Sequence, residues 1–199
     1  MIRPLSIDGF EAVYELRLAG TVAFVAIAHA AGGHAFGGIR IRAYDEDALA
    51  LEDALALARA MTRKVALAGI EGGGAKTVLV EPAPERRAEA VAELGTFIES
   101  LGGKYHAGPD YGFTPADEAI LRTTTRHAGH GDLAAGTAES VARTMAIAAG
   151  PFRRVVIQGL GAVGRLLAER LSRDGIEVAA AEIRPVKDLL TSFVSVPPE

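Results

Sequence analysis

The sequence of 199 residues predicts an α/β fold in two domains. Short apolar runs rich in β-branched residues alternate with longer segments whose apolar residues recur every three to four positions, as strands and helices do in α/β proteins. Apolar residues make up 49% of the chain, which is enough for a sizeable core. A polar, glycine-containing loop near residues 129–136 separates two halves. We therefore expect a first domain over residues 1–135 and a second over residues 136–199.

In the first domain, the apolar and β-branched run Thr21 to Ala30 predicts a buried strand. A second strand follows over Phe36 to Tyr44, where apolar and basic residues alternate. Acidic residues at positions 45–47 supply the start of a helix that runs to about Leu67, and Gly69 is placed to end it. The same patterns predict shorter strands at residues 77–80 and 104–107 and helices at residues 84–101 and 115–127.

In the second domain, a helix is expected over residues 137–149, and the apolar strand Arg154 to Gln158 runs into a GxGxxG turn. The turn consists of Gly159, Leu160, Gly161, Ala162, Val163 and Gly164, and a helix to Arg173 and a strand over residues 177–181 follow it. The three glycines allow a tight turn, close approach of a pyrophosphate and close packing of helix on strand. Glu182, at the end of the second strand, is placed to accept from ribose hydroxyls and would repel a 2′-phosphate, which favours NAD over NADP. The alternative is a plain glycine turn in an α/β domain.

Two lysines and one carboxylate in the first domain form the candidate catalytic set. Lys64 closes the long helix, Lys76 is expected on a glycine-rich turn, and Asp110 lies between Pro109 and Gly112. Glycines beside all three suggest a pocket for a small anionic substrate, and a buried lysine readily changes its pKa and can serve as a base. The alternatives are solvated surface lysines and a turn-forming aspartate.

Composition excludes several other classes of function. The net charge of −4 gives no indication of nucleic-acid or membrane binding, and the absence of cysteine removes disulfide and thiolate chemistry. We see no signal peptide and no apolar run long enough to span a bilayer, so a cytoplasmic location is expected. His127, His130 and Asp132 have the chemistry of metal ligands, but a surface loop is the better interpretation, and no metal site is expected.

The order and spacing of these motifs resemble the glutamate/leucine/phenylalanine/valine dehydrogenase family, closest to its leucine and phenylalanine branch. The resemblance covers residues 22–182 and rests on Gly37–Arg40, Met61–Lys64, Gly73–Thr77, Pro109–Gly112, Thr137–Ala138 and the GxGxxG turn. It implies a mixed-sheet domain for substrate binding and dimerisation, followed by the first βαβ unit of a Rossmann domain. It also implies NAD-dependent oxidative deamination of a small apolar L-amino acid to the 2-oxo acid and ammonium.

The resemblance also implies a role for each matching residue. Lys76 would be the catalytic lysine that activates water for attack on the imine, Asp110 would carry protons to and from the amino group, and Lys64 would pair with the substrate carboxylate. The remaining implied contacts are Gly37 and Gly38 to the substrate, Phe36 and Met61 to its side chain, Thr137 to the nicotinamide, and Gly159, Gly161, Ala162, Val163, Gly164 and Glu182 to the rest of NAD. Ser140 and Phe113 depart from the family pattern.

The end of the chain differs in composition from the rest. Residues 183–199 contain three prolines and no alanine or glycine, so we expect that they cannot build the missing strands of a complete Rossmann domain, and we interpret the chain as a C-terminally truncated relative. Two functions follow as alternatives: an NAD-dependent amino-acid dehydrogenase, or a non-catalytic homologue that binds amino acids or assembles with full-length subunits. A homo-oligomer is expected to form through the first domain, with Thr21 to Ala30 as an exposed edge strand.

Overall fold

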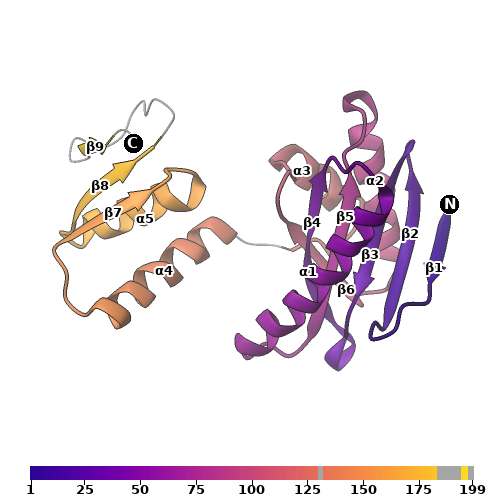
Figure 1. Ribbon diagram of the computed structural model, residues 1–199, viewed down its shortest axis with the longest axis horizontal. Helices are drawn as coiled ribbons and strands as arrows, with labels where there is room; N and C mark the ends of the chain where they lie inside the picture. Colours follow the sequence, from indigo (N-terminus) through magenta and orange to yellow (C-terminus); the bar gives the residue numbers. More distant parts are fainter. Residues whose placement is uncertain (130–131, 183–193, 197–199) are drawn as a thin grey trace. The chain divides into compact units, whose positions relative to one another are not determined.

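A computed structural model describes residues 1–129, 132–182 and 194–196 of the chain. The chain divides into two compact units, Met1–His130 and Gly131–Glu199, each built from strands and helices (Figure 1). The α/β class and the mixed sheet of the first unit are as predicted.

The first unit contains a six-stranded mixed sheet with the strand order β1-β2-β3-β5-β4-β6. Antiparallel pairing joins β1 (Ile2–Leu5), β2 (Ala12–Leu18), β3 (Thr21–Ile27) and β5 (Gly73–Val80). Parallel pairing joins β4 (Ala35–Arg42) to β5 on one side and to β6 (Tyr105–Pro109) on the other. The two parallel pairs place the start of β4, β5 and β6 at one end of the sheet and their ends at the other.

The strand order corrects the expectation that Thr21 to Ala30 forms an edge strand. β3 lies between β2 and β5, and the edge on that side of the sheet is β1, which the sequence analysis did not predict. β2 was also missed, because the buried Glu15 interrupts its apolar alternation. Glu15 is only 7% exposed and pairs with Arg3 and Arg17 on the same strand pair, which explains how a carboxylate is accommodated there.

The predicted glycine-rich turn around Lys76 is also wrong, because Lys76 lies inside β5. The neighbouring glycines serve packing instead of a turn. A Cβ on Gly74 would come within 2.1 Å of the backbone nitrogen of Thr62, so only glycine lets helix α1 (Asp47–Leu67) approach the strand this closely.

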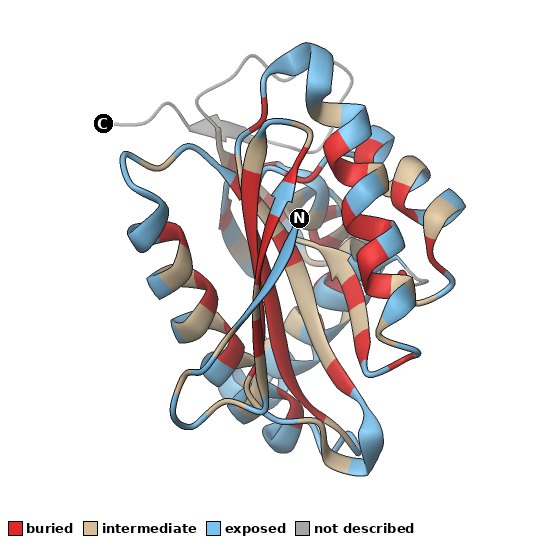
Figure 2. Cartoon of the chain, turned by 90° about the vertical axis from the view of Figure 1, so that its right-hand side faces the viewer, coloured by how far each residue is buried: buried red, intermediate tan, exposed pale blue. Residues whose placement is uncertain are grey.

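Helices cover both faces of this sheet. On one face, α1 buries Ala50, Ala54 and Ala58 against side chains of β2, β3 and β5. On the other, α2 (Arg87–Ser100) and α3 (Pro115–Thr124) pack over a larger apolar cluster that includes Leu94 and Leu121. Buried residues accordingly follow the sheet and the inward sides of the helices (Figure 2). Two short 3₁₀ turns, Ala31–Gly33 and Pro84–Arg86, complete the unit.

The second unit is a parallel three-stranded sheet with helices. Its elements are α4 (Leu133–Ala149), β7 (Arg154–Gln158), α5 (Ala162–Arg173), β8 (Glu177–Ala181) and β9 (Val194–Val196), with the strand order β7-β8-β9. One short strand of the tail, β9, pairs with β8, and it is the only strand of the tail among the described residues. Helix α4 begins four residues earlier than predicted, because the Asp132 side chain caps it by accepting from the Ala135 N–H. In the described part of the chain, no helix has the length and apolar character needed to cross a membrane.

An ion pair fixes the loop that carries Asp110 into α3. Asp117 is only 2% exposed and closes a capping box with Thr114. Arg87 at the start of α2 donates to both Asp117 oxygens, at 2.9 and 2.7 Å, and to the carbonyl of Gly112 at 2.6 Å. Phe113, which departs from the family pattern, packs into the core on the same side. The segment after Asp110 is therefore held at several points.

Asp117→Asn should remove a pH-dependent part of the stability. Burial alone would raise the pKa of Asp117, but the hydrogen bonds from Arg87 and Thr114 outweigh it and lower the pKa below the usual range. The contribution of Asp117 is thus complete above its unfolded pKa of about 3.9 and is lost as the pH falls through the lower folded value. We expect the variant to lose roughly 1–3 kcal/mol at neutral pH and the gap from wild type to narrow below about pH 4. Urea unfolding across this range measures the gap, and a constant gap would contradict the prediction.

Candidate active site

The candidate site lies on the half of the sheet formed by β4 and β6, on the face that α1 shares. Along both strands, residues directed to the α2 and α3 side, such as Ile39 and Tyr105, are fully buried. The residues that alternate with them are half-buried and chemically distinctive: Phe36, Gly38 and Arg40 on β4, and His106, Gly108 and Asp110 on or just after β6. Strand register pairs Phe36 with His106 and Gly38 with Gly108, so the two rows lie side by side.

Lys76 and Asp110 form the central contact of this face. The Lys76 Nζ donates to the Asp110 Oδ2 at 2.6 Å, and the Lys76 side chain is only 6% exposed. Burial lowers the pKa of Lys76, and this effect outweighs the opposing influence of Asp110. Burial would raise the pKa of Asp110, but the hydrogen bond and the charge of Lys76 outweigh it and lower that pKa. The pair thus combines a carboxylate whose resting form at neutral pH is ionised with an amine that releases its proton more readily than a free lysine.

Three further residues join this pair, and sequence reasoning assigned them no role. Arg40 Nε donates to the same Asp110 oxygen at 3.1 Å, and Arg40 Nη1 donates to Asp53 Oδ2 at 3.0 Å. The Tyr44 hydroxyl also donates to Asp53 Oδ2, at 2.5 Å. A signal was present, since Arg40 closes the Gly37–Arg40 motif and Asp53 interrupts the apolar pattern of α1. Neither signal shows that the two residues meet.

The predicted substrate residues Lys64 and Met61 lie on α1, toward the end of the helix. Asp53, Leu57, Met61 and Lys64 are spaced by four, four and three residues, so they form one stripe along the helix. Because Asp53 contacts Arg40 of β4, this stripe borders the β4 side of the face. Met61 is half-buried and Lys64 is exposed on the last turn. Among the described residues Lys64 forms no ion pair, and it does not join the Lys76–Asp110 contact.

The predicted substrate glycines Gly37 and Gly38 are required by packing within the unit. A Cβ on Gly37 would lie 1.8 Å from the carbonyl oxygen of Ala75, so the close approach of β4 to β5 excludes a side chain. A Cβ on Gly38 would lie 2.8 Å from the Asp110 Cβ and 3.1 Å from the Lys76 Nζ. Gly108, opposite Gly38, has open space at its Cβ position. The charged pair therefore fills the space above Gly38, and Gly108 leaves a bare glycine floor beside it.

Aromatic rings lie on the other side of this floor, about two residues or roughly 7 Å along the strands. Phe36 stacks on His106 with centroids 5.3 Å apart and an interplanar angle of 26°. The His106 Nε2 lies 3.3 Å from the His34 Nδ1, and His127 meets the His106 ring edge-on. Burial and then the neighbouring His127 and His34 lower the pKa of His106, which favours a neutral imidazole near pH 7.

In the second unit, the GxGxxG turn joins β7 to α5 as predicted. Gly159 has a φ of 89°, which an L side chain rarely adopts, and a Cβ on Gly164 would lie 2.1 Å from the Gly159 carbonyl oxygen. Gly161 is the N-cap of α5, and Ala162 and Val163 are the first residues of the helix. The first N–H groups of a helix have no partner within the helix, and such groups suit a phosphate.

The remaining predicted cofactor residues make contacts within this unit. The Glu182 carboxylate accepts from the Leu160 N–H at 2.8 Å, which ties the end of β8 to the turn. Thr137 is exposed on the first turns of α4, and its hydroxyl donates to the Leu133 carbonyl at 2.6 Å. Of the three metal-ligand candidates, Asp132 caps α4 and His127 approaches Glu99, while His130 lies outside the described residues.

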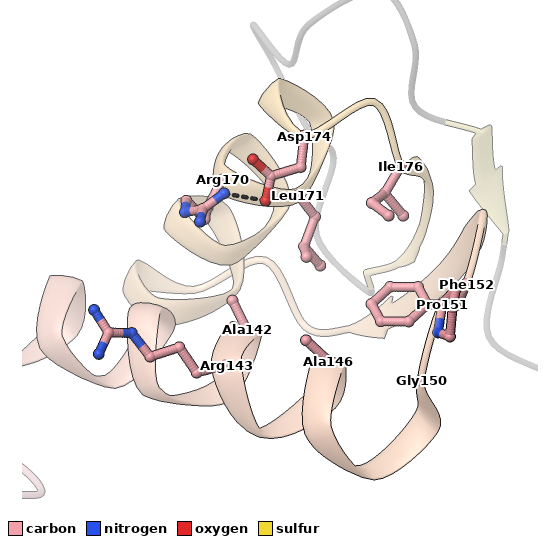
Figure 3. Close-up of a pocket in the computed structure, with 10 residues that line it drawn as sticks. All are labelled: Ala142, Arg143, Ala146, Gly150, Pro151, Phe152, Arg170, Leu171, Asp174 and Ile176. Carbon is pink, nitrogen blue, oxygen red and sulfur yellow. Dashed lines mark hydrogen bonds and ion pairs between the residues drawn. The ribbon is translucent and has the colours of Figure 1, made fainter.

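A hollow of about 270 Å³ in the second unit does not coincide with either site. It lies between the end of α4, the turn after it and the end of α5 (Figure 3). Arg170 and Asp174, which pair with each other, and Phe152 are among its lining residues. The GxGxxG turn lies at the opposite, N-terminal end of α5, so this hollow is separate from the turn.

Comparison with known proteins gives consistent matches. A family model described as Glu/Leu/Phe/Val dehydrogenase, dimerisation domain, matches residues 16–127. Valine dehydrogenase of Streptomyces albus is 36% identical over 194 residues, which cover 89% of this chain and 53% of that protein. Leucine dehydrogenase of Geobacillus stearothermophilus is 34% identical, with 82% of this chain and 49% of that protein covered. The chain spans about half the length of the curated relatives it matches.

Solved structures show the same likeness. The crystal structure of L-tryptophan dehydrogenase from Nostoc punctiforme matches with a TM-score of 0.72 and 29% identity, over 96% of this chain and 60% of that one. The hetero-hexameric glutamate dehydrogenase from Thermus thermophilus matches with a TM-score of 0.64 and 23% identity, which shows the shared fold.

Gly38→Ala and Gly108→Ala form a matched pair that tests the glycine floor. The added methyl at position 38 would overlap Asp110 and Lys76, whereas the methyl at position 108 meets nothing within 4 Å. We expect Gly38→Ala to cost about 1–3 kcal/mol of unfolding free energy and Gly108→Ala to cost clearly less. Urea unfolding of both variants measures the difference. Equal costs would show that the Lys76–Asp110 contact does not need the space above Gly38.

Proposed function

Since the chain belongs to the Glu/Leu/Phe/Val dehydrogenase family, we propose that its site performs NAD-dependent oxidative deamination of an L-amino acid. The products are the 2-oxo acid, ammonium and NADH. The observation that carries this proposal is the buried Lys76 in contact with Asp110 beside a bare glycine floor. On this basis, residues 1–135 bind substrate and assemble subunits, and residues 136–199 contribute to NAD binding.

The two charged groups have complementary tasks. Asp110 accepts a proton from the substrate ammonium, which frees the nitrogen lone pair for loss of hydride from the α-carbon. The resulting imine is attacked by water, and Lys76 takes a proton from that water because its lowered pKa makes a neutral amine accessible. Collapse of the adduct expels the nitrogen, which leaves as ammonium after proton transfer from the same pair. Lys64 holds the carboxylate of the substrate from α1.

The lining supports an uncharged substrate side chain. A substrate whose α-carbon lies near Lys76 and Asp110 directs its side chain over Gly108 toward Phe36 and His106. The lining there consists of the aromatic rings of Phe36 and His106 together with Met61 of α1. The lowered pKa of His106 favours its neutral form. A side-chain carboxylate would find no fixed cation among these groups, whereas a small apolar side chain would be accommodated.

NAD is the cofactor that the second unit fits best. Gly159 and Gly161 leave open space at the helix start, Gly164 lets the helix pack closely on the turn, and Glu182 beside the turn disfavours a 2′-phosphate. The bound dinucleotide would supply the hydride acceptor. Subunits would associate through the first unit, whose family match is a dimerisation domain and whose β1 edge has exposed residues.

Turnover and binding should be measured on the same variants. We expect the chain with NAD and L-valine, L-leucine or L-phenylalanine to generate NADH absorbance, and Lys76→Ala to abolish it. Lys104→Ala is the control, because Lys104 lies outside the site and pairs with Glu11 on the surface. Calorimetry with the same amino acids reports binding independently of turnover.

Each outcome has a defined meaning. Binding without NADH formation, lost in Lys76→Ala and kept in Lys104→Ala, would favour the non-catalytic alternative. No binding and no turnover in the wild type, or equal effects of the two substitutions, would overturn the assignment of this site.

A further inference from the structure

We propose that Arg40 is a positioning residue that holds the Asp110 carboxylate beside Lys76, and that Asp53 and Tyr44 hold Arg40 in turn. The catalytic meaning of this arrangement rests on the proposed function, whereas the arrangement itself is a property of the first unit. Its members come from separate elements: Lys76 from β5, Arg40 from β4, Asp53 from α1, and Asp110 from the end of β6.

The contacts are those of a partly buried network. Arg40 and Asp53 have side-chain exposures of only 22% and 25%, and Asp110 has 30%. Two cations and two anions balance within the group, so no member is left buried without an opposite charge. The charged groups that act on the pKa of Lys76 are Asp110 just after β6, Arg40 on β4 and Asp53 on α1, and β3 places Ala26 opposite Lys76.

The guanidinium geometry is what makes Arg40 suited to this place. Its Nε donates a hydrogen bond to Asp110 and its Nη1 donates one to Asp53, so one rigid planar group bridges two carboxylates. A lysine ammonium at this position is a single point of charge and cannot occupy both places. The Tyr44 hydroxyl adds a second donor to Asp53, and burial followed by the Asp53 hydrogen bond raises the pKa of Tyr44 to about 12, so the hydroxyl keeps its proton.

The contacts with Lys76 and Arg40 fix the orientation of the Asp110 carboxylate. Lys76 and Arg40 both donate to Oδ2, and in the described part of the chain no side chain donates to Oδ1. The backbone N–H of Tyr111 also bonds to this carboxylate, so we place the amino group of a substrate at the remaining acceptor positions of Asp110. Without Arg40, the carboxylate is free to turn and give both oxygens to Lys76, which would hold the lysine more firmly as an ammonium ion.

The experiment measures the protonation of Lys76 directly and needs neither amino acid nor NAD. Trace acetylation with isotopically labelled acetic anhydride, followed by mass spectrometry of the peptide containing Lys76, gives the titration midpoint of this amine. The full chain is compared with Arg40→Gln, Arg40→Lys and Arg17→Gln, after urea unfolding has shown that each is folded. Arg17 is the matched control, because it also links two carboxylates, Glu15 on its strand and Asp47 on α1.

We expect Arg40→Gln to raise the Lys76 midpoint by about half a pH unit or more, because a neighbouring cation is lost and Asp110 pairs with Lys76 alone. Arg40→Lys should also raise the Lys76 midpoint, since the positive charge remains but the bridge between Asp110 and Asp53 is broken. If Arg40→Gln does not fold, the result for Arg40→Lys alone tests the positioning role. Arg17→Gln should leave the midpoint unchanged.

Two results would overturn the proposal. One is a wild-type midpoint in both Arg40 variants. The other is a wild-type midpoint in Arg40→Lys with a shift in Arg40→Gln, which would show that charge alone matters and that Arg40 positions nothing. If the midpoints shift as expected while the chain binds no amino acid, the positioning role stands and the proposed function fails.

Discussion

The burial of one ammonium group governs the organisation of the first unit. Lys76 lies in the middle of β5 beneath α1, where a charge without a partner would cost several kcal/mol. Asp110 supplies the opposite charge from the end of β6, two strands away in the sheet. For these two groups to meet across β4, the intervening position must be a glycine, and Gly38 fills it. The need to neutralise Lys76 thus links three strands and fixes which residues are tolerated between them.

Arg40 also takes part in balancing the charges around Lys76. Its contacts with Asp110 and Asp53 connect the sheet to α1, so the helix that buries Lys76 also contributes to the electrostatic balance around it. Arg87 acts in a comparable way on the following segment, where its bonds to Gly112 and Asp117 hold the loop after Asp110. The carboxylate at the centre of the site is therefore fixed from both sides by arginines on neighbouring elements.

Glycines in this chain have different physical roles that look alike in the sequence. Gly37 and Gly74 allow close backbone approach, and Gly159 adopts a left-handed conformation. Neither close packing nor a left-handed conformation requires a glycine at position 108, and Gly108 leaves open space above the sheet. That combination of crowded and open glycines produces a surface with charge at one end and aromatic rings at the other.

The sequence alone determined the α/β class, most helices and strands, the GxGxxG turn and the family, because these depend on residue type and short-range spacing, and the family match and strand pairing confirm them. It also singled out Lys76 and Asp110. Only the tertiary structure decided that β3 is an interior strand, that Lys76 lies within a strand, that β9 joins β8, and that Arg40 meets Asp53 and Asp110. Strand order and the contacts of Arg40 depend on residues up to seventy positions apart, as in the Arg40–Asp110 pair, and no local pattern records which distant elements come together.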